Sequence, residues 1–169
     1  MKRVCAWCEK VLGVFDSRAV SANIISHGIC DQCKDMLLGP QRVLFMAFLD
    51  GLNVPVVVVS SEGHIETANK YARELLQKEL PDIVGFKGGD VFDCAYSVLP
   101  GGCGKSIHCD GCTIRNAVMG TFLTGESRLE TEASLIHGTP DNNHEIKFEI
   151  STEKFRDVIL LRISSINHA

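Results

Sequence analysis

The stretch Val54-Pro-Val-Val-Val-Val-Ser-Ser-Glu-Gly-His-Ile-Glu-Thr-Ala-Asn69 decides the fold. Its β-branched residues predict a strand over 54–59, and Ser60-Ser-Glu-Gly63 has the composition of a turn. Residues 64–68 form the second strand of the predicted hairpin. Asn69 then precedes an apolar-periodic stretch over 70–78, so we expect it to cap a helix there.

The C-terminal half adds one long helix and three strands. Apolar residues recur every four positions from Ile114, which predicts a helix over 113–125. Asn142-Asn143 marks a turn between two of three predicted strands, which cover residues 128–137, 144–151 and 158–166. Five strands with helices concentrated between them predict an α+β domain, in which a five-stranded antiparallel sheet carries helices on one face.

Residues 40–51 precede this domain and predict a short helix. Gly39-Pro40 ends the preceding element, and Pro40 suits the first helical position. The helix is apolar almost all round, so it either packs on the domain or buries a face against a second copy of the chain. We favour the second interpretation, a homodimer. The predicted divisions are a module at 1–39, a linker helix at 40–51 and the sheet domain at 52–169.

Eight cysteines form two sets of four, separated by sixty residues without a cysteine. The first set is Cys5-Ala-Trp-Cys8 and Cys30-Asp-Gln-Cys33, two C-x2-C pairs of the kind that hold one metal ion. Four thiolates close the coordination shell of zinc, so we predict a structural zinc that stabilises a module too small for its own core. His27 is expected outside the ligand set, and Trp7 is expected to pack.

The second set consists of Cys94, Cys103, Cys109 and Cys112, in a glycine-rich loop over 93–112. Glycines allow several turns to converge, so the loop is predicted to be a binding loop. Four thiolates suit either zinc or an iron–sulfur cluster, and the spacing does not decide between them. Cys109 and Cys112 alone could also form a reversible disulfide.

Several segments of the sequence resemble known signalling domains. Residues 52–166 resemble a PAS domain, through Val54-Pro-Val-Val-Val-Val59, Gly63-His-Ile-Glu-Thr-Ala-Asn69 and Gly85-Phe-Lys-Gly-Gly-Asp-Val-Phe92. The first cysteine set, with Ser26-His-Gly-Ile-Cys30, is similar to a zinc-binding module that often accompanies bacterial PAS sensors. The second set resembles a cysteine-bearing subgroup of those sensors. The resemblance implies a sensor in signal transduction.

Composition and charge exclude other classes. With 17 basic and 21 acidic residues the net charge is −4, which argues against a nucleic-acid partner. No apolar run approaches the roughly 18–20 residues of a membrane span, and no signal peptide is visible, so we expect a cytoplasmic protein. No catalytic triad, phosphate-binding loop or kinase motif is present, which predicts that the protein is not an enzyme.

These observations predict a cytoplasmic sensor. Its PAS-like domain would hold a metal centre at the second cysteine set, respond to redox state, oxygen or a small ligand, and signal through a partner such as a kinase or regulator. One alternative is an interaction adaptor stabilised by two structural zinc ions. Another is a thiol–disulfide oxidoreductase that uses Cys109 and Cys112.

Overall fold

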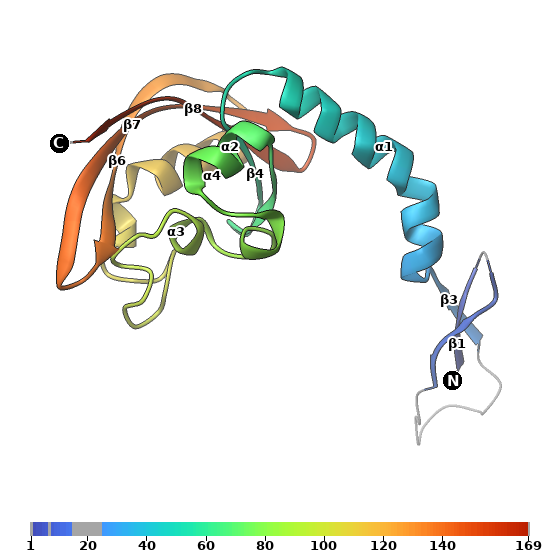
Figure 1. The fold of residues 1–169 in the computed structure, drawn as a ribbon. Coiled ribbons are helices and arrows are strands. Elements are labelled where there is room, and N and C mark those ends of the chain that lie inside the picture. The colour runs from blue at the N-terminus through green and yellow to red at the C-terminus, as the bar shows by residue number, and fades with distance from the viewer. Residues whose placement is uncertain (1, 7, 15–24, 169) are drawn as a thin grey trace. The chain divides into compact units, whose positions relative to one another are not determined.

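The computed structural model describes residues 2–6, 8–14 and 25–168 (Figure 1). The chain divides into two compact units, Met1–Phe48 and Leu49–Ala169. The first unit carries the first cysteine set and the second unit carries the second set. Trp7, expected to pack, lies outside the described residues. Across the described ranges, no helix is long and apolar enough to cross a membrane.

The first unit contains a three-stranded sheet, with β1 (Lys2–Cys5) between β2 (Val11–Val14) and β3 (Ile25–Gly28). β1 pairs antiparallel with β2 and parallel with β3. The N–H of Cys5 donates to the carbonyl oxygen of Lys10 at 2.8 Å and closes the turn between β1 and β2. Val11, Val14 and Ile25 are exposed. Burial of these side chains therefore contributes little to the stability of this sheet.

Helix α1 (Asp31–Gly51) begins earlier than the sequence predicts. The expectation that Pro40 starts a helix is wrong, because α1 continues through Gly39 and Pro40. Proline lacks an N–H, so its position costs α1 one backbone hydrogen bond without necessarily ending the helix. Asp31 lies in the first turn, where a carboxylate is favoured by the helix dipole, and this residue is the better start signal.

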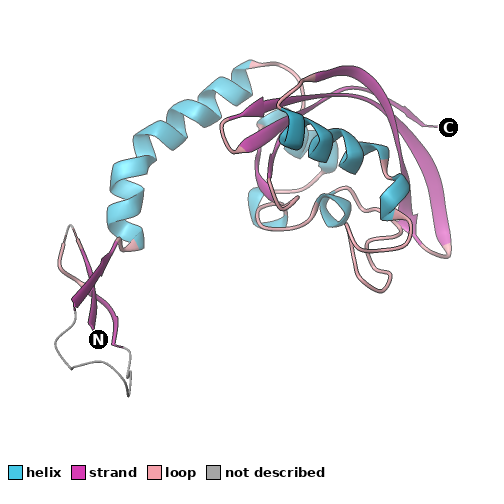
Figure 2. Ribbon diagram, turned by 180° about the vertical axis from the view of Figure 1, so that it is seen from behind, coloured by secondary structure: helices cyan, strands magenta, loops and turns pink. Residues whose placement is uncertain are grey.

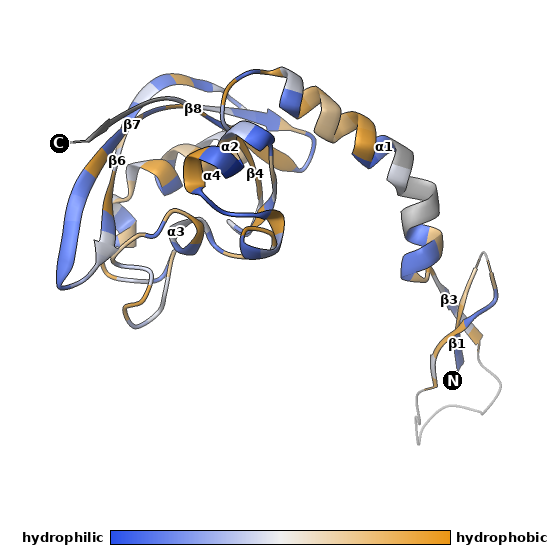
Figure 3. Ribbon diagram, viewed as in Figure 1, coloured by the Kyte–Doolittle hydropathy of each residue, from blue (hydrophilic) through white to orange (hydrophobic). Residues whose placement is uncertain are grey.

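The apolar stretch of α1 is visible as the orange run in Figure 3. Leu49 is fully buried, whereas Val43, Leu44 and Phe48 are 68%, 70% and 57% exposed. The face predicted to meet a second copy is therefore uncovered in the single chain. Dimerisation through it stays a prediction.

The second unit is built on a five-stranded sheet of order β5-β4-β8-β7-β6, antiparallel throughout. Its strands are β4 (Val56–Ser60), β5 (Ile65–Ala68), β6 (Arg128–Thr139), β7 (Asn142–Phe155) and β8 (Val158–His168). The hairpin of β4 and β5 agrees with the prediction. The last three strands run further than expected, and the turn falls at Pro140-Asp141 instead of Asn142-Asn143. The side chain of Asn143 still supports this turn by donating to the carbonyl oxygens of Thr139 and Pro140.

Three helices cover one face of this sheet (Figures 1 and 2). They are α2 (Lys70–Leu76), α3 (Gly88–Val91) and α4 (Thr113–Thr124), with short 3₁₀ turns at Leu80–Asp82 and Cys109–Gly111. The core lies between them and the sheet, and Phe92 contacts Phe148 edge to face at 6.2 Å between ring centroids. This arrangement confirms the predicted α+β class with helices on one face.

Asn69 joins four pieces of the second unit and is fully buried. Its Oδ1 accepts hydrogen bonds from the N–H groups of Val56 (2.9 Å) and Ala72 (3.0 Å). Its Nδ2 donates to the carbonyl oxygens of Leu49 and Val54, each at 2.8 Å. The predicted cap of α2 is thus confirmed, and the same side chain also fixes the end of α1 and the start of β4.

Candidate metal centres

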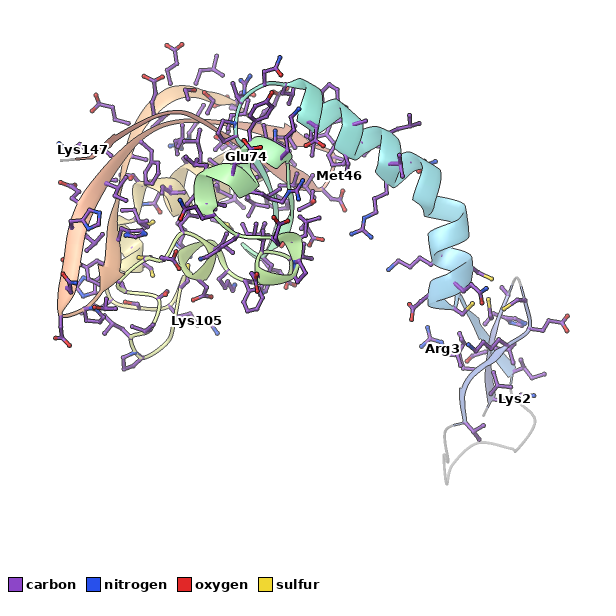
Figure 4. All side chains as sticks on the ribbon, in the orientation of Figure 1. Lys2, Arg3, Met46, Glu74, Lys105 and Lys147 are labelled. Carbon is purple, nitrogen blue, oxygen red and sulfur yellow. The ribbon has the colours of Figure 1, made fainter. Side chains whose placement is uncertain are left out.

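The first cysteine set meets at one point. Cys5 ends β1, Cys8 lies in the turn that follows, and Cys30 and Cys33 flank the start of α1. Their four Sγ atoms lie within 4.8 Å of one another, and those of Cys8 and Cys30 are 3.6 Å apart. Figure 4 shows sulfur atoms gathered at the start of α1. Zn–S bonds of about 2.3 Å place tetrahedral sulfurs about 3.8 Å apart, so the group has the size that one zinc ion requires.

Backbone groups and neighbouring thiols define the electrostatics of this first set. The N–H of Cys30 points at the Sγ of Cys5, and the N–H of Cys33 points at the Sγ of Cys30, both at 3.4 Å. Hydrogen bonding with the Cys30 thiol is the main cause that raises the pKa of Cys33 to about 12. A bound metal ion would reverse this preference of Cys33, because a coordinated thiol is deprotonated.

His27 does not belong to this group. It lies on β3 opposite Val4, and its side chain is exposed. Among the residues whose side chains the structure describes, the four cysteines are the one set of three or more His, Cys, Asp or Glu whose ligand atoms gather closely enough for a single ion.

The second cysteine set surrounds a cavity. Cys94, Cys103, Cys109 and Cys112 all line one cavity of about 400 Å³ in the second unit. Apolar side chains from the sheet and from α4 line part of it, among them Leu135, Leu161 and Val118. All four cysteines of the loop over 93–112 thus line the same cavity, and the binding role of this loop stays a prediction.

Two of these cysteines are held by neighbouring secondary structure. Cys94 forms an isolated antiparallel bridge with His137 of β6. Cys112 caps the N-terminus of α4, where its Sγ accepts from the N–H of Arg115 at 3.5 Å. A thiolate at a helix N-terminus is stabilised by the helix dipole.

The other two cysteines accept hydrogen bonds from glycine backbone. The N–H of Gly89 in α3 donates to the Sγ of Cys103 at 3.1 Å, and the N–H of Gly104 donates to the Sγ of Cys109 at 3.1 Å. Such N–H···S bonds are a common means of stabilising metal-bound thiolates. The Sγ atoms of Cys103, Cys109 and Cys112 thus accept from backbone N–H groups of α3, the loop itself and α4, while a backbone bridge ties Cys94 to β6.

Two of the cavity thiols resist ionisation when no cation is bound, because burial raises the pKa of Cys94 and of Cys103 above the ordinary value. For these two thiols, a raised pKa is the opposite of what an activated nucleophile needs. Lys87, Lys105 and Arg115 line the cavity together with Glu62, and Figure 4 labels Lys105 on the loop. The excess of cationic side chains over this carboxylate favours an anionic assembly in the cavity.

Several residues around the cavity carry no motif and were not singled out by the sequence. Tyr96 and His108 stack with ring centroids 3.8 Å apart and planes 14° apart, and both line the cavity. Gly89 and Arg115 act through their backbone N–H groups, which no side-chain pattern reveals. The signal for Gly89 was the Gly88-Gly89 pair, since adjacent glycines indicate close approach of backbone to another group.

Comparisons with known proteins concern the fold of the chain and not its function. No family model matches the chain, and no curated protein sequence matches it. A domain of a sensory box sensor histidine kinase/response regulator from Geobacter sulfurreducens is similar at 15% identity and a TM-score of 0.49, over 76% of this chain and 96% of that one. The PAS domain of Bordetella pertussis BvgS is similar at 11% identity and a TM-score of 0.46, over 76% and 88%.

The PAS domain of nitrogen regulation protein NR(II) from Vibrio parahaemolyticus is similar at 13% identity and a TM-score of 0.42, over 75% and 98%. Likeness at this level carries no conclusion about activity, ligand or partner. The expected PAS-like fold class rests on the five-stranded antiparallel sheet and the helices on one of its faces, which the structure shows directly.

Proposed function

We propose that this chain is a cytoplasmic signal-transduction sensor with a metal centre in the cavity of its second unit. Cys94, Cys103, Cys109 and Cys112 would hold the centre, and a structural zinc at Cys5, Cys8, Cys30 and Cys33 would stabilise the first unit. The observation that supports this most is that the sulfurs of Cys103, Cys109 and Cys112 accept hydrogen bonds from three different parts of one unit. The backbone of Cys94 is bridged to a fourth part, β6.

A centre bound in this way is mechanically coupled to the fold. A metal that draws on all four sulfurs ties β6, α3 and α4 to one another, and its oxidation or loss releases them. Both states are available to one chain, which is the requirement for a two-state switch biased by a local event. Within the unit, α4 is also joined to the sheet by the hydroxyls of Thr121 and Thr152, 2.7 Å apart.

The first unit would have a structural role as a stable, zinc-bound platform, and it would take no part in sensing. Zinc with four thiolates has no open position for a substrate, and the exposed apolar residues of this small sheet leave metal binding as the main stabilising term. The output would pass to a partner protein such as a kinase or regulator, with the exposed face of α1 as the dimer contact. The protein would have no enzymatic activity of its own.

Hydrogen exchange on the full chain tests the sensor proposal. Protein purified without oxygen is compared with the same protein after exposure to air and a chelator. We expect faster amide exchange in α3, α4 and β6 after treatment, because the sulfur ligands no longer hold these elements together. Cys8→Ser is the control, since it removes a ligand of the first site alone. Unchanged exchange in α4 and β6 would reduce the protein to an adaptor with two structural sites.

A further inference from the structure

The two cysteine sets differ in geometry, and the spacing of their sulfur atoms can be compared directly. In the first set, four Sγ atoms lie within 4.8 Å of one another. That spacing fits one ion with bonds of about 2.3 Å. In the second set, the four cysteines line one cavity of about 400 Å³. In the part of the chain whose side chains the structure describes, this set does not have all its ligand atoms within 4.8 Å of one another.

The cavity sulfurs are also fixed in their separate places. Cys103 is held by the N–H of Gly89, Cys109 by that of Gly104 and Cys112 by that of Arg115, at 3.1, 3.1 and 3.5 Å. One zinc ion requires all four sulfurs to approach to about 3.8 Å. Since this set does not gather within 4.8 Å, a single zinc ion would have to draw at least one sulfur inward from its present place. A centre with more than one metal ion does not require all four sulfurs to converge on one point.

The surroundings suit a large anionic cofactor in a site of low polarity. N–H groups directed at the sulfurs, an apolar wall that includes Leu135 and Leu161, and a rim with Lys87, Lys105 and Arg115 are all present. Hydrogen bonds to sulfur, net charge and solvent exposure are the means by which a protein stabilises and tunes an iron–sulfur cluster.

From this contrast we infer that Cys94, Cys103, Cys109 and Cys112 bind an iron–sulfur cluster, while zinc is confined to the first set. The inference rests on the proposed function, because it names the cofactor of the same cavity. On binding, four thiol protons pass to solvent and four Fe–Sγ bonds form. Iron is supplied from outside as a mixture of ferrous and ferric ions, together with sulfide, so that the cluster assembles without a further oxidant or reductant. Both [2Fe–2S] and [4Fe–4S] clusters take four cysteine ligands and satisfy the inference.

The test is metal analysis of the full chain, purified without oxygen and then incubated with ferrous and ferric iron, sulfide and one equivalent of zinc. We expect about one zinc per chain, together with iron and acid-labile sulfide in equal amounts, and an absorption band in the visible region that bleaches in air. Cys103→Ser should lose the iron, the sulfide and the band and keep its zinc. Cys8→Ser should lose the zinc and keep the cluster.

Retained zinc in Cys103→Ser shows that its first unit is folded. Cys94→Ser, which removes a ligand from another part of the loop, guards against a misfolded second unit. Two zinc ions per chain with no bound sulfide would overturn the inference, as would an iron–sulfur signal that survives both substitutions.

The inference and the sensor proposal can fail separately. A cavity filled with zinc whose removal still accelerates exchange in α4 and β6 leaves a sensor with a different metal. A cluster whose loss leaves exchange in α4 and β6 unchanged leaves the cofactor without a sensing role.

Discussion

Gly89 and Cys103 approach each other so closely that only glycine fits. The N–H of Gly89 donates to the Sγ of Cys103 at 3.1 Å, and a Cβ built on residue 89 would stand 2.8 Å from that sulfur. Carbon and sulfur atoms that are not bonded do not pack at this distance. A residue with no chemistry in its side chain thus sets the position of one predicted metal ligand.

Gly89→Ala should therefore displace Cys103 and weaken metal binding in the cavity. We expect roughly a tenfold to hundredfold loss of affinity, the usual range when support for a ligand is removed. Competition with a chelator, followed by the absorption of the centre, measures it. Gly88→Ala is the matched control, because a Cβ at residue 88 meets nothing within 4 Å. Equal metal retention in the two variants would remove Gly89 from the site.

Thr121 and Thr152 connect α4 to β7 through a hydrogen bond between fully buried hydroxyls, 2.7 Å apart. Thr121→Val should lower the free energy of unfolding by about 1–3 kcal/mol, because it leaves the hydroxyl of Thr152 buried without a partner. The double variant Thr121→Val/Thr152→Val should recover much of that loss, since neither polar group remains. Urea unfolding of Thr121→Val, Thr152→Val and the double variant gives the coupling energy between the two hydroxyls. If the losses of the two single variants simply add in the double variant, the hydroxyls are not coupled and the prediction is wrong.

The sequence was most informative where a residue type has one structural role and exerts it on its close neighbours in the chain. The β-branched run over 54–59 and the turn after it predicted the hairpin of β4 and β5, and Asn69 predicted the start of α2, because a cap acts within three residues. The C-x2-C pairs predicted that Cys5, Cys8, Cys30 and Cys33 meet, since each pair lies on one short turn or helix start.

Features that depend on packing between distant residues could not be predicted in the same way. The contact of Gly89 with Cys103 joins residues fourteen positions apart and acts through backbone, so no side-chain pattern marks it. Spacing alone could not distinguish four cysteines that meet at a point from four that surround a cavity. Pro40 misled because proline is compatible with the first turn of a helix and, at a cost, with its interior.

Asn69→Ala should be among the most damaging single changes to the second unit. It removes four hydrogen bonds and leaves the carbonyl oxygens of Leu49 and Val54 without this donor. We expect a loss of about 2–4 kcal/mol in the free energy of unfolding, measured by urea denaturation. Asn142→Ala, at the exposed first position of β7, should change it by less than about 0.5 kcal/mol.

Asn69→Asp separates the two halves of this network. An aspartate keeps the oxygen that accepts from Val56 and Ala72 but lacks the N–H groups that reach Leu49 and Val54. Its stability should fall between that of Asn69→Ala and that of the unaltered chain. A variant as stable as the unaltered chain would mean that the contacts to the end of α1 contribute nothing.

Removal of zinc should unfold the first unit and spare the second. The small sheet of β1, β2 and β3 exposes Val11, Val14 and Ile25, whereas the second unit has a continuous core between its sheet and helices. A metal that supplies most of the folding free energy of the small sheet takes that stability away when it leaves.

After treatment with a chelator, amide exchange in β1 and β3 should rise by more than about tenfold, while β7 and β8 keep their protection. Zinc, but not magnesium, should restore the slow exchange, because thiolates select the softer ion. Slow exchange in β1 and β3 after complete metal loss would show that the sheet is stable without it and that the four cysteines are not its main support.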